Sequence, residues 1–293
     1  MAGGISYDES QQREAIVNPG MLLLVSLLAA EGAAEQTAVA PAVAVDGVLV
    51  HEVRSSYQQG TTQIQVLLPS NVDRDKKHSV VYVLPVEAKN ESRYGEGLLE
   101  IKQQNLHEKY QAIFVAPTFS HLPWYCDHPT DPAIRQETYF LKVVVPFIDK
   151  SYPAGTSRDY RMLLGFSKSG WGAWSLLLRH PELFGRAAAW DAPMMTESLG
   201  RYGTTPIFGT AENFAQYRIQ DVLRTKGRFL GPDKRLVLTG PGNFRSEHEQ
   251  IHALMDAWSI PHEYRDTQLR KHDWHSGWVP EAVELLLTGD RNP

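Results

Sequence analysis

Residues 160–179 read YRMLLGFSKSGWGAWSLLLR, and this stretch decides the predicted fold. Its apolar first part is typical of a buried strand, and its last part has the composition of a helix. Between the two, Ser167 lies on a turn flanked by Gly165 and Gly170. Such a turn holds a serine hydroxyl clear of the backbone, and the helix N-terminus stabilises negative charge beside it. Ser167 is therefore a candidate nucleophile, with a plain loop serine as the alternative.

Strand-like and helix-like segments alternate on both sides of this turn. Apolar runs at residues 48–53, 62–68, 79–84, 113–117, 186–191, 235–240 and 262–266 predict strands. Helix-like patterns occupy residues 137–152, 182–184, 246–258 and 279–288. This alternation predicts an α/β fold with a mostly parallel sheet, helices on both faces and an antiparallel N-terminal entry. Ligands then bind outside the carboxyl ends of the strands.

The N-terminal part of the chain differs in composition from the rest. Residues 1–46 are interpreted as an extension, and residues 47–293 as one catalytic domain with a helical insertion or cap at about 193–230. The apolar run at 21–30 has the length of a signal-peptide core, but acidic residues precede it. Export to the periplasm or medium and a cytoplasmic location are both left open. The run is too short to span a bilayer, and residues 31–46 are interpreted as a linker.

Composition excludes several classes of protein. The chain has 293 residues, 42% of them hydrophobic, which suits a large globular domain. A formal net charge of −5 gives no basic excess for nucleic acid, and a single cysteine excludes an internal disulfide framework. No cofactor is predicted, and the oligomeric state is not indicated.

A serine nucleophile requires an imidazole base and a group that orients it. His272 and His275 both follow the last predicted strand, and His272, the first in the loop, is the preferred base. The acid commonly follows the penultimate strand, where Asn243 stands instead. Asp191, at the end of the strand after the candidate helix, is slightly preferred over Glu247. A plain turn or cap residue is the alternative role for Asp191.

The oxyanion formed during acyl transfer requires two N–H donors. The Lys168 N–H, directly after the nucleophile, is the first candidate. The second is the N–H of Val86 or Glu87, since Pro85 has none.

Together these residues resemble the esterase D-like branch of the α/β-hydrolases, which includes S-formylglutathione hydrolases, feruloyl and acetylxylan esterases and mycolyltransferases. The resemblance covers about residues 45–290, and it implies the α/β-hydrolase fold and ester hydrolysis through an acyl-serine. It also implies that Trp124 and Tyr125 line the acyl or alcohol pocket, with core packing as the alternative. The landmarks are the serine turn and residues 124–127, 145–149, 179–184 and 271–274.

The chain departs from the pattern of that family in three places. Ser169 replaces the usual glycine after the nucleophile, the Pro85–Glu87 loop replaces a His-Gly sequence, and Asn243 stands near the expected acid. The last departure leaves the acid of the triad open between Asp191 and Glu247.

A literal H-E-x-x-H motif at residues 248–252 offers a competing chemistry. His248 and His252 share a helix face and would bind zinc, with Glu249 as base. No glycine-spaced third histidine follows, and the helix lies between two strands of the α/β pattern, so a structural role is favoured.

The leading hypothesis is a serine carboxylesterase that acts on small-molecule esters with short acyl chains. An acyltransferase on the same scaffold is the first alternative. A non-catalytic binding protein is the second, and a zinc hydrolase is the third.

Overall fold

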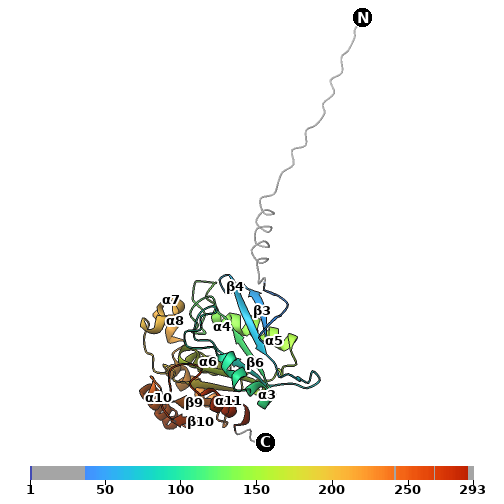
Figure 1. Cartoon of the computed structure of the whole chain (residues 1–293). Helices are drawn as coiled ribbons and strands as arrows, with labels where there is room; N and C mark the ends of the chain where they lie inside the picture. Colours follow the sequence, from blue (N-terminus) through green and yellow to red (C-terminus); the bar gives the residue numbers. More distant parts are fainter. Residues whose placement is uncertain (2–36, 241, 267, 290–293) are drawn as a thin grey trace. The chain divides into compact units, whose positions relative to one another are not determined.

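The computed structural model describes Met1 and residues 37–240, 242–266 and 268–289. The chain divides into two compact units at Gln36–Thr37, and the second unit carries the described helices and strands (Figure 1). The predicted signal-like run at 21–30 lies outside the described residues. Within the described ranges, no helix has the length and apolar character needed to cross a membrane.

One mixed sheet of ten strands forms the centre of the described part. Its order is β1-β3-β4-β6-β5-β7-β8-β9-β10, with β2 also paired to β3. The neighbouring strands β6, β5, β7, β8, β9 and β10 pair in parallel. The strands β1, β2, β3 and β4 form antiparallel pairs, and β4 joins the parallel part through an antiparallel pair with β6. The bounds are β1 Ala38–Val39, β2 Val43–Val45, β3 Val48–Arg54, β4 Thr61–Leu67, β5 Val80–Val83, β6 Ile113–Pro117, β7 Arg161–Phe166, β8 Arg186–Trp190, β9 Leu236–Gly240 and β10 His262–Asp266. The predicted fold class is confirmed.

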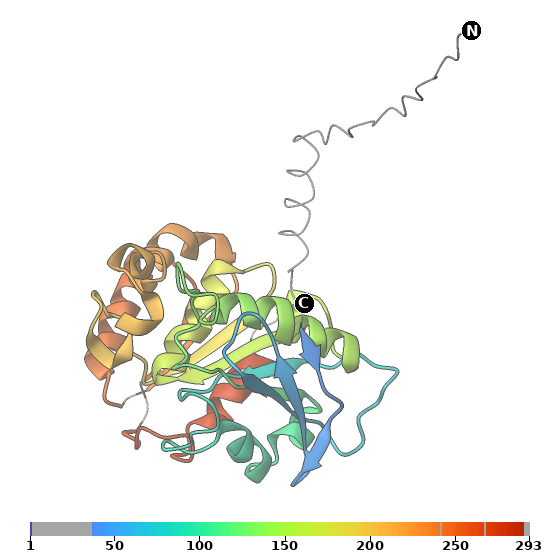
Figure 2. The same cartoon turned by 90° about the horizontal axis from the view of Figure 1, so that it is seen from above.

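Helices cover both faces of this sheet (Figure 2). Alternate side chains of β7 enter opposite cores, since Leu163 packs in one and Met162 and Leu164 pack in the other. The first core is covered by α4 (Gln136–Tyr139), α5 (Val145–Ser151), α6 (Ser167–Arg179), α9 (Ile219–Lys226) and α10 (Arg245–Ala257). The second is covered by α2 (Gly97–Gln103), α3 (Leu106–Tyr110) and α11 (Val279–Thr288).

Three local features differ from the sequence-based expectation. Part of the predicted linker pairs with β3 as β1 and β2, so the compact unit begins at Thr37 rather than at 47. The expected short helix at 182–184 is not formed, because three residues cannot offset the cost of nucleating a helix. The expected helix at 137–152 contains a π-helical segment, Phe140–Val144, just before Pro146, which has no N–H to donate.

The segment between β8 and β9 holds only helical elements among its described residues. These are η3 (Arg201–Gly203), α7 (Thr205–Phe208), α8 (Ala211–Ala215), α9 and η4 (Gly227–Leu230). The carboxyl ends of β5, β7, β8 and β9 lie along one edge of the sheet, because these neighbouring strands are parallel. The candidate site is built on that edge.

Candidate active site

Ser167 lies at the sharp turn where β7 ends and α6 begins. Its φ of +51° is a left-handed conformation that serine rarely adopts, and its exposed fraction is 8%. Glycine at 165 is required, because a Cβ there would lie 2.3 Å from the Ser169 carbonyl oxygen. Gly170 packs closely on β8 and the residues after it, where a Cβ would lie 3.2 Å from that of Ala189 and 3.0 Å from that of Ala192. The turn is therefore tight on both sides of the serine, as a strained functional turn requires.

Ser169, which replaces the expected glycine, closes this turn. Its hydroxyl oxygen accepts from the Phe166 N–H at 3.1 Å and donates to the Phe166 carbonyl at 2.9 Å. The side chain is fully buried. These bonds satisfy backbone groups at the start of α6 that no helical bond reaches. The departure at 169 thus has a structural role in holding the turn.

His272 lies in the segment that follows β10. The His272 Nδ1–H donates to Asp191 Oδ2 at 2.6 Å, so the Nε2 atom remains for proton transfer. The His272 ring packs against Phe166, with 5.1 Å between ring centroids, and Phe166 directly precedes Ser167. The structure therefore brings the preferred base to the serine turn and pairs it with Asp191, the preferred acid.

Asp191 directly follows β8, the strand beside the one that ends at the serine. It is fully buried, and its φ of +42° turns the chain sharply at this point. Its Oδ1 accepts from the Phe244 N–H at 2.7 Å. Burial alone would raise the pKa of Asp191, but the bonds from His272 and from the Phe244 and Asn243 N–H groups outweigh it. The pKa therefore falls below the usual 3.8, and the carboxylate stays charged.

The loop after β9 leaves room for this carboxylate. A Cβ on Gly242 would lie 2.1 Å from the Asp191 carboxyl carbon. Asn243, at the position expected for the acid, contributes its backbone N–H to Asp191 instead. Sequence reasoning missed these N–H donors, and the Gly-Pro-Gly-Asn run at 240–243 was the available signal.

Two side chains of α10 hold the backbone just after Asp191. His248 Nε2 accepts from the Ala192 N–H at 2.9 Å, and burial lowers the pKa of His248 to about 4. Glu247 Oε2 accepts from the Met195 N–H at 2.8 Å, and burial raises the pKa of Glu247. Glu247, the alternative acid, thus accepts a hydrogen bond from a backbone N–H group. His248, the first histidine of the H-E-x-x-H motif, does the same.

The rival base and the other residues of the H-E-x-x-H motif each have different partners. His275, the rival base, bonds to Glu100 Oε2 through its Nδ1 at 2.7 Å. Glu249 pairs on the surface with Arg245, at 3.2 Å between Nε and Oε1. His252 contacts His262 Nε2 at 2.8 Å, whereas His248 faces Ala192. This arrangement does not favour a catalytic zinc site built on His248, Glu249 and His252.

The Pro85–Glu87 loop, which carries the other candidate oxyanion donors, is buried and anchored at several points. Val86 and Glu87 have exposed fractions of 2% and 3%. The Tyr125 hydroxyl donates to the Pro85 carbonyl at 2.7 Å. Glu87 accepts from the Arg93 Nε and from the Tyr94 N–H, both at 3.2 Å. The loop is therefore held in one conformation before any substrate arrives.

Lys168 follows the candidate nucleophile and lies in the first turn of α6, where helical N–H groups have no intrahelical partner. Burial lowers the pKa of its ammonium group, the negative charge of Glu87 opposes this shift, and Arg93 adds to it. The backbone N–H of Lys168 and the buried loop at Val86 and Glu87 thus stay the candidates for the oxyanion donors.

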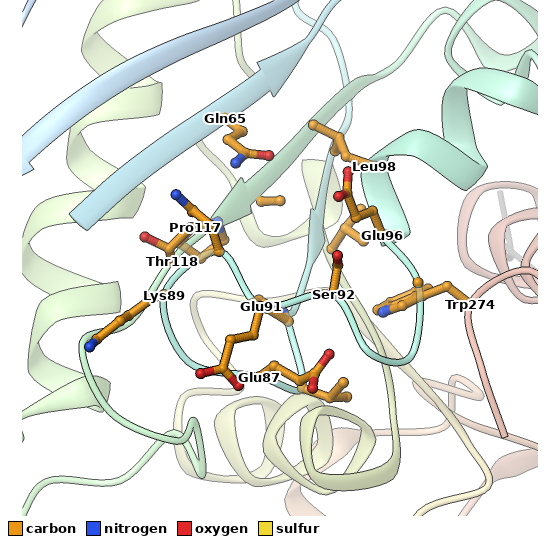
Figure 3. A pocket seen from close by; sticks show the side chains of 17 residues that line it. Gln65, Glu87, Lys89, Glu91, Ser92, Glu96, Leu98, Pro117, Thr118 and Trp274 are labelled. Atoms are coloured by element: carbon orange, nitrogen blue, oxygen red, sulfur yellow. The ribbon is translucent and has the colours of Figure 1, made fainter.

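A cavity of about 120 Å³ adjoins the Pro85–Glu87 loop (Figure 3). Glu87, Glu91 and Trp274 line it, together with residues from the carboxyl ends of β5 and β6. Ser167 and His272 do not line it, so the cavity lies to one side of the reacting groups. Its volume is well below the roughly 300–1,000 Å³ of pockets for drug-sized ligands.

Trp124 and Tyr125 are both fully buried. The Trp124 ring packs against Trp171 and Phe208, at centroid distances of 5.3 and 6.1 Å. Tyr125 packs on Gly172, where a Cβ would lie 2.0 Å from its ring. These contacts favour core packing for both residues, and Tyr125 also bonds to the Pro85–Glu87 loop through its hydroxyl.

Comparisons with known proteins bear on the family and the fold of the chain. A sequence profile described as "Putative esterase" matches residues 55–220, more than half of the chain. A comparison with curated protein sequences finds no significant match.

Solved structures of esterases share the fold. A structure titled ferulic acid esterase superposes with a TM-score of 0.63 and 19% identity, covering 87% of this chain and 98% of that one. An S-formylglutathione hydrolase from Staphylococcus aureus gives 0.65 and 12%, with 86% and 100% covered. Another from Agrobacterium tumefaciens gives 0.63 and 15%, with 85% and 98% covered.

Proposed function

The chain belongs to the putative esterase family of α/β-hydrolases, and from this premise we propose that it hydrolyses carboxylic esters through an acyl-serine at Ser167. The observation that carries the proposal is the Asp191–His272 pair, 2.6 Å between Oδ2 and Nδ1, whose imidazole ring packs on Phe166 beside the serine turn. A buried carboxylate that fixes the tautomer of a histidine next to a strained serine is the arrangement that activates a hydroxyl.

The first half of the reaction forms the acyl-enzyme. Ser167 Oγ attacks the ester carbonyl carbon, while its proton passes to His272 Nε2. Negative charge develops on the carbonyl oxygen, where the N–H groups of Lys168 and of Val86 or Glu87 donate to it. When the tetrahedral intermediate collapses, the ester C–O bond breaks and the alcohol leaves with the proton from His272.

The second half releases the acid product. Water takes the place of the alcohol and gives a proton to His272 Nε2 as its oxygen attacks the acyl carbon. Collapse of this intermediate returns the proton to Ser167 Oγ and frees the carboxylic acid. Asp191 stays ionised throughout and stabilises the imidazolium that forms twice in each cycle. No step requires a cofactor.

The cavity beside the Pro85–Glu87 loop does not reach Ser167, but Val86 and Glu87, the candidate oxyanion donors, line it, and on that ground we infer a preference for short acyl chains. It is small, and the side chains of Glu87, Glu91 and Glu96 contribute to its lining. A long alkyl chain gains little from such a surface, because burying carboxylates beside hydrocarbon is unfavourable. We therefore expect acetyl esters to be hydrolysed faster than octanoyl esters.

The test compares wild type with Ser167→Ala and Ser175→Ala on p-nitrophenyl acetate. Ser175 is the matched control, because it lies buried on the same helix and its hydroxyl has no hydrogen-bond partner among the described residues. We expect Ser167→Ala to lose at least about 1,000-fold in kcat/KM and Ser175→Ala to keep the wild-type value. Equal rates for Ser167→Ala and wild type would overturn the proposal, and the acetate-to-octanoate rate ratio tests the chain-length preference.

A further inference from the structure

Three side chains with metal-binding atoms meet where α10 ends and β10 begins. His252 and Asp256 are four residues apart on α10, and His262 is the first residue of β10. One ring nitrogen of each histidine and one carboxylate oxygen lie within 4.8 Å of one another. This cluster belongs to neither the serine turn nor the Asp191–His272 pair.

The local structure aims these atoms at a common point. His262 Nδ1–H donates to the Ile260 carbonyl at 2.8 Å, which leaves the Nε2 lone pair directed toward His252 Nδ1, 2.8 Å away. A backbone carbonyl that receives the second N–H of a histidine is the usual way in which a metal ligand is oriented. The His252 ring is held in turn by stacking on Tyr264, with 4.2 Å between centroids.

The separations suit a tetrahedral ion. Zinc bonds to imidazole nitrogen and carboxylate oxygen at about 2.0–2.2 Å, which places neighbouring ligand atoms about 3.4 Å apart. Here His252 Nδ1 and His262 Nε2 are 2.8 Å apart, and Asp256 Oδ1 lies 3.8 Å from His262 Nε2. The 3.6 Å contact of Asp256 Oδ2 is with the other ring nitrogen of His252, Nε2. A shared ion therefore requires rotation of the His252 and Asp256 side chains, which are 32% and 64% exposed.

We propose that His252, Asp256 and His262 bind one Zn²⁺ ion, with water completing its coordination. Binding replaces the proton that the two facing ring nitrogens now share, so it releases a proton and weakens as the pH falls. The ion then joins the end of α10 to the edge strand β10. Only the second histidine of the H-E-x-x-H motif takes part, and Glu249 remains with Arg245.

The structure gives this ion a stabilising role. The first turn of α10 carries His248 and Glu247, which hold the backbone after Asp191. An ion at the other end of α10 stabilises the folded state and leaves the Asp191–His272 pair in place. A chelator is therefore expected to lower the melting temperature without lowering the initial rate on p-nitrophenyl acetate at 25 °C.

The experiment titrates untagged, metal-stripped protein with ZnSO₄ and follows calorimetric binding and the melting temperature. We expect one ion per chain in wild type and a rise of about 5 °C when free zinc reaches 100 times its Kd. His262→Ala and Asp256→Asn should weaken zinc binding at least tenfold. Glu249→Gln is the matched control, because it alters the motif but not the cluster, and it should bind as wild type does.

Two results would overturn the proposal. One is the absence of binding heat and of a melting shift in wild type. The other is an equal shift in wild type, His262→Ala and Asp256→Asn, which would assign the zinc to other sites among the 11 histidines. Cobalt(II) absorption of wild type gives an answer even if a variant fails to fold, since a tetrahedral site and an octahedral aquo ion have different spectra.

Discussion

Two buried carboxylate–histidine pairs of this molecule look alike and differ in their surroundings. Asp191 and His272 are 2.6 Å apart at the edge of the sheet, and Glu137 and His180 are 2.5 Å apart beneath the helical segment after β8. Glu137 also accepts two bonds from Arg179, at 3.1 and 3.0 Å, and one from a tyrosine hydroxyl. The other donors to Asp191 are neutral backbone N–H groups.

The difference lies in the permanent positive charge. Burial raises the pKa of Glu137, but the hydrogen bonds from His180 and Arg179 and the permanent charge of Arg179 outweigh it, so the pKa falls to about 2. Among the described residues, no lysine or arginine forms an ion pair with Asp191, and its charge remains available to stabilise a transient imidazolium. A carboxylate–histidine pair therefore indicates catalysis only where no fixed cation has already neutralised the acid.

The largest expected effect is on the first pair. Asp191→Asn removes the charge and lets an amide face His272 Nδ1, which favours the wrong tautomer. We expect kcat/KM for p-nitrophenyl acetate to fall by about 10,000-fold with an unchanged circular dichroism spectrum. A loss smaller than tenfold would mean that the Asp191–His272 pair is structural, like the Glu137–His180 pair.

The second pair should respond in stability and not in rate. Glu137→Gln leaves Arg179 unpaired, so we expect about 3 kcal/mol less unfolding free energy at pH 7. The folded pKa of Glu137 is about 2 against an ordinary 4.5, so its contribution is complete above pH 4.5 and is lost as the pH falls through 2. Urea denaturation at several pH values should therefore show the difference between wild type and Glu137→Gln shrinking below pH 4.5.

The matched control for Glu137→Gln is Glu182→Gln. Glu182 approaches the same His180, at 3.8 Å from its Nδ1, but is 74% exposed. We expect a change below about 0.5 kcal/mol at every pH. A similar loss for both variants would show that burial does not distinguish these two glutamates.

The smallest effect is expected for His275→Ala. This histidine also pairs with a buried carboxylate, Glu100, but its ring is half-exposed and bonds away from the serine turn. We expect less than a threefold change in kcat/KM on p-nitrophenyl acetate. A loss above 100-fold would exchange the roles proposed for His272 and His275.

The sequence predicted those parts of the fold that depend on long local patterns. The helix predicted at 279–288 coincides with α11, because its apolar residues recur with the helical period. The run at 79–84 contains β5, because its apolar signal is continuous. The strands of two and three residues before β3 carry almost no such signal, since their pairing partner determines them. The π-helical segment before Pro146 is likewise a response to a missing N–H.

The sequence did not predict those features of the candidate site that depend on contacts between residues far apart in the chain. The serine turn has a local signature, but the choice between Asp191 and Glu247 depends on which of them faces His272. Gly242 makes room for Asp191 only because β8 and β9 are adjacent. Burial of Trp124 depends on packing against the distant Trp171, which an aromatic pair in a loop does not reveal.

The place of Asp191 directly after β8 puts two of the three proposed catalytic residues on one supersecondary unit. Ser167 and Asp191 lie within or at the end of one continuous β7–α6–β8 unit, so a single crossover connection determines the positions of the proposed nucleophile and acid. The base alone comes from the far end of the chain. The segment between β8 and β9 is therefore a natural place for new chain termini or for an inserted domain, because cutting there keeps nucleophile and acid in one covalent piece.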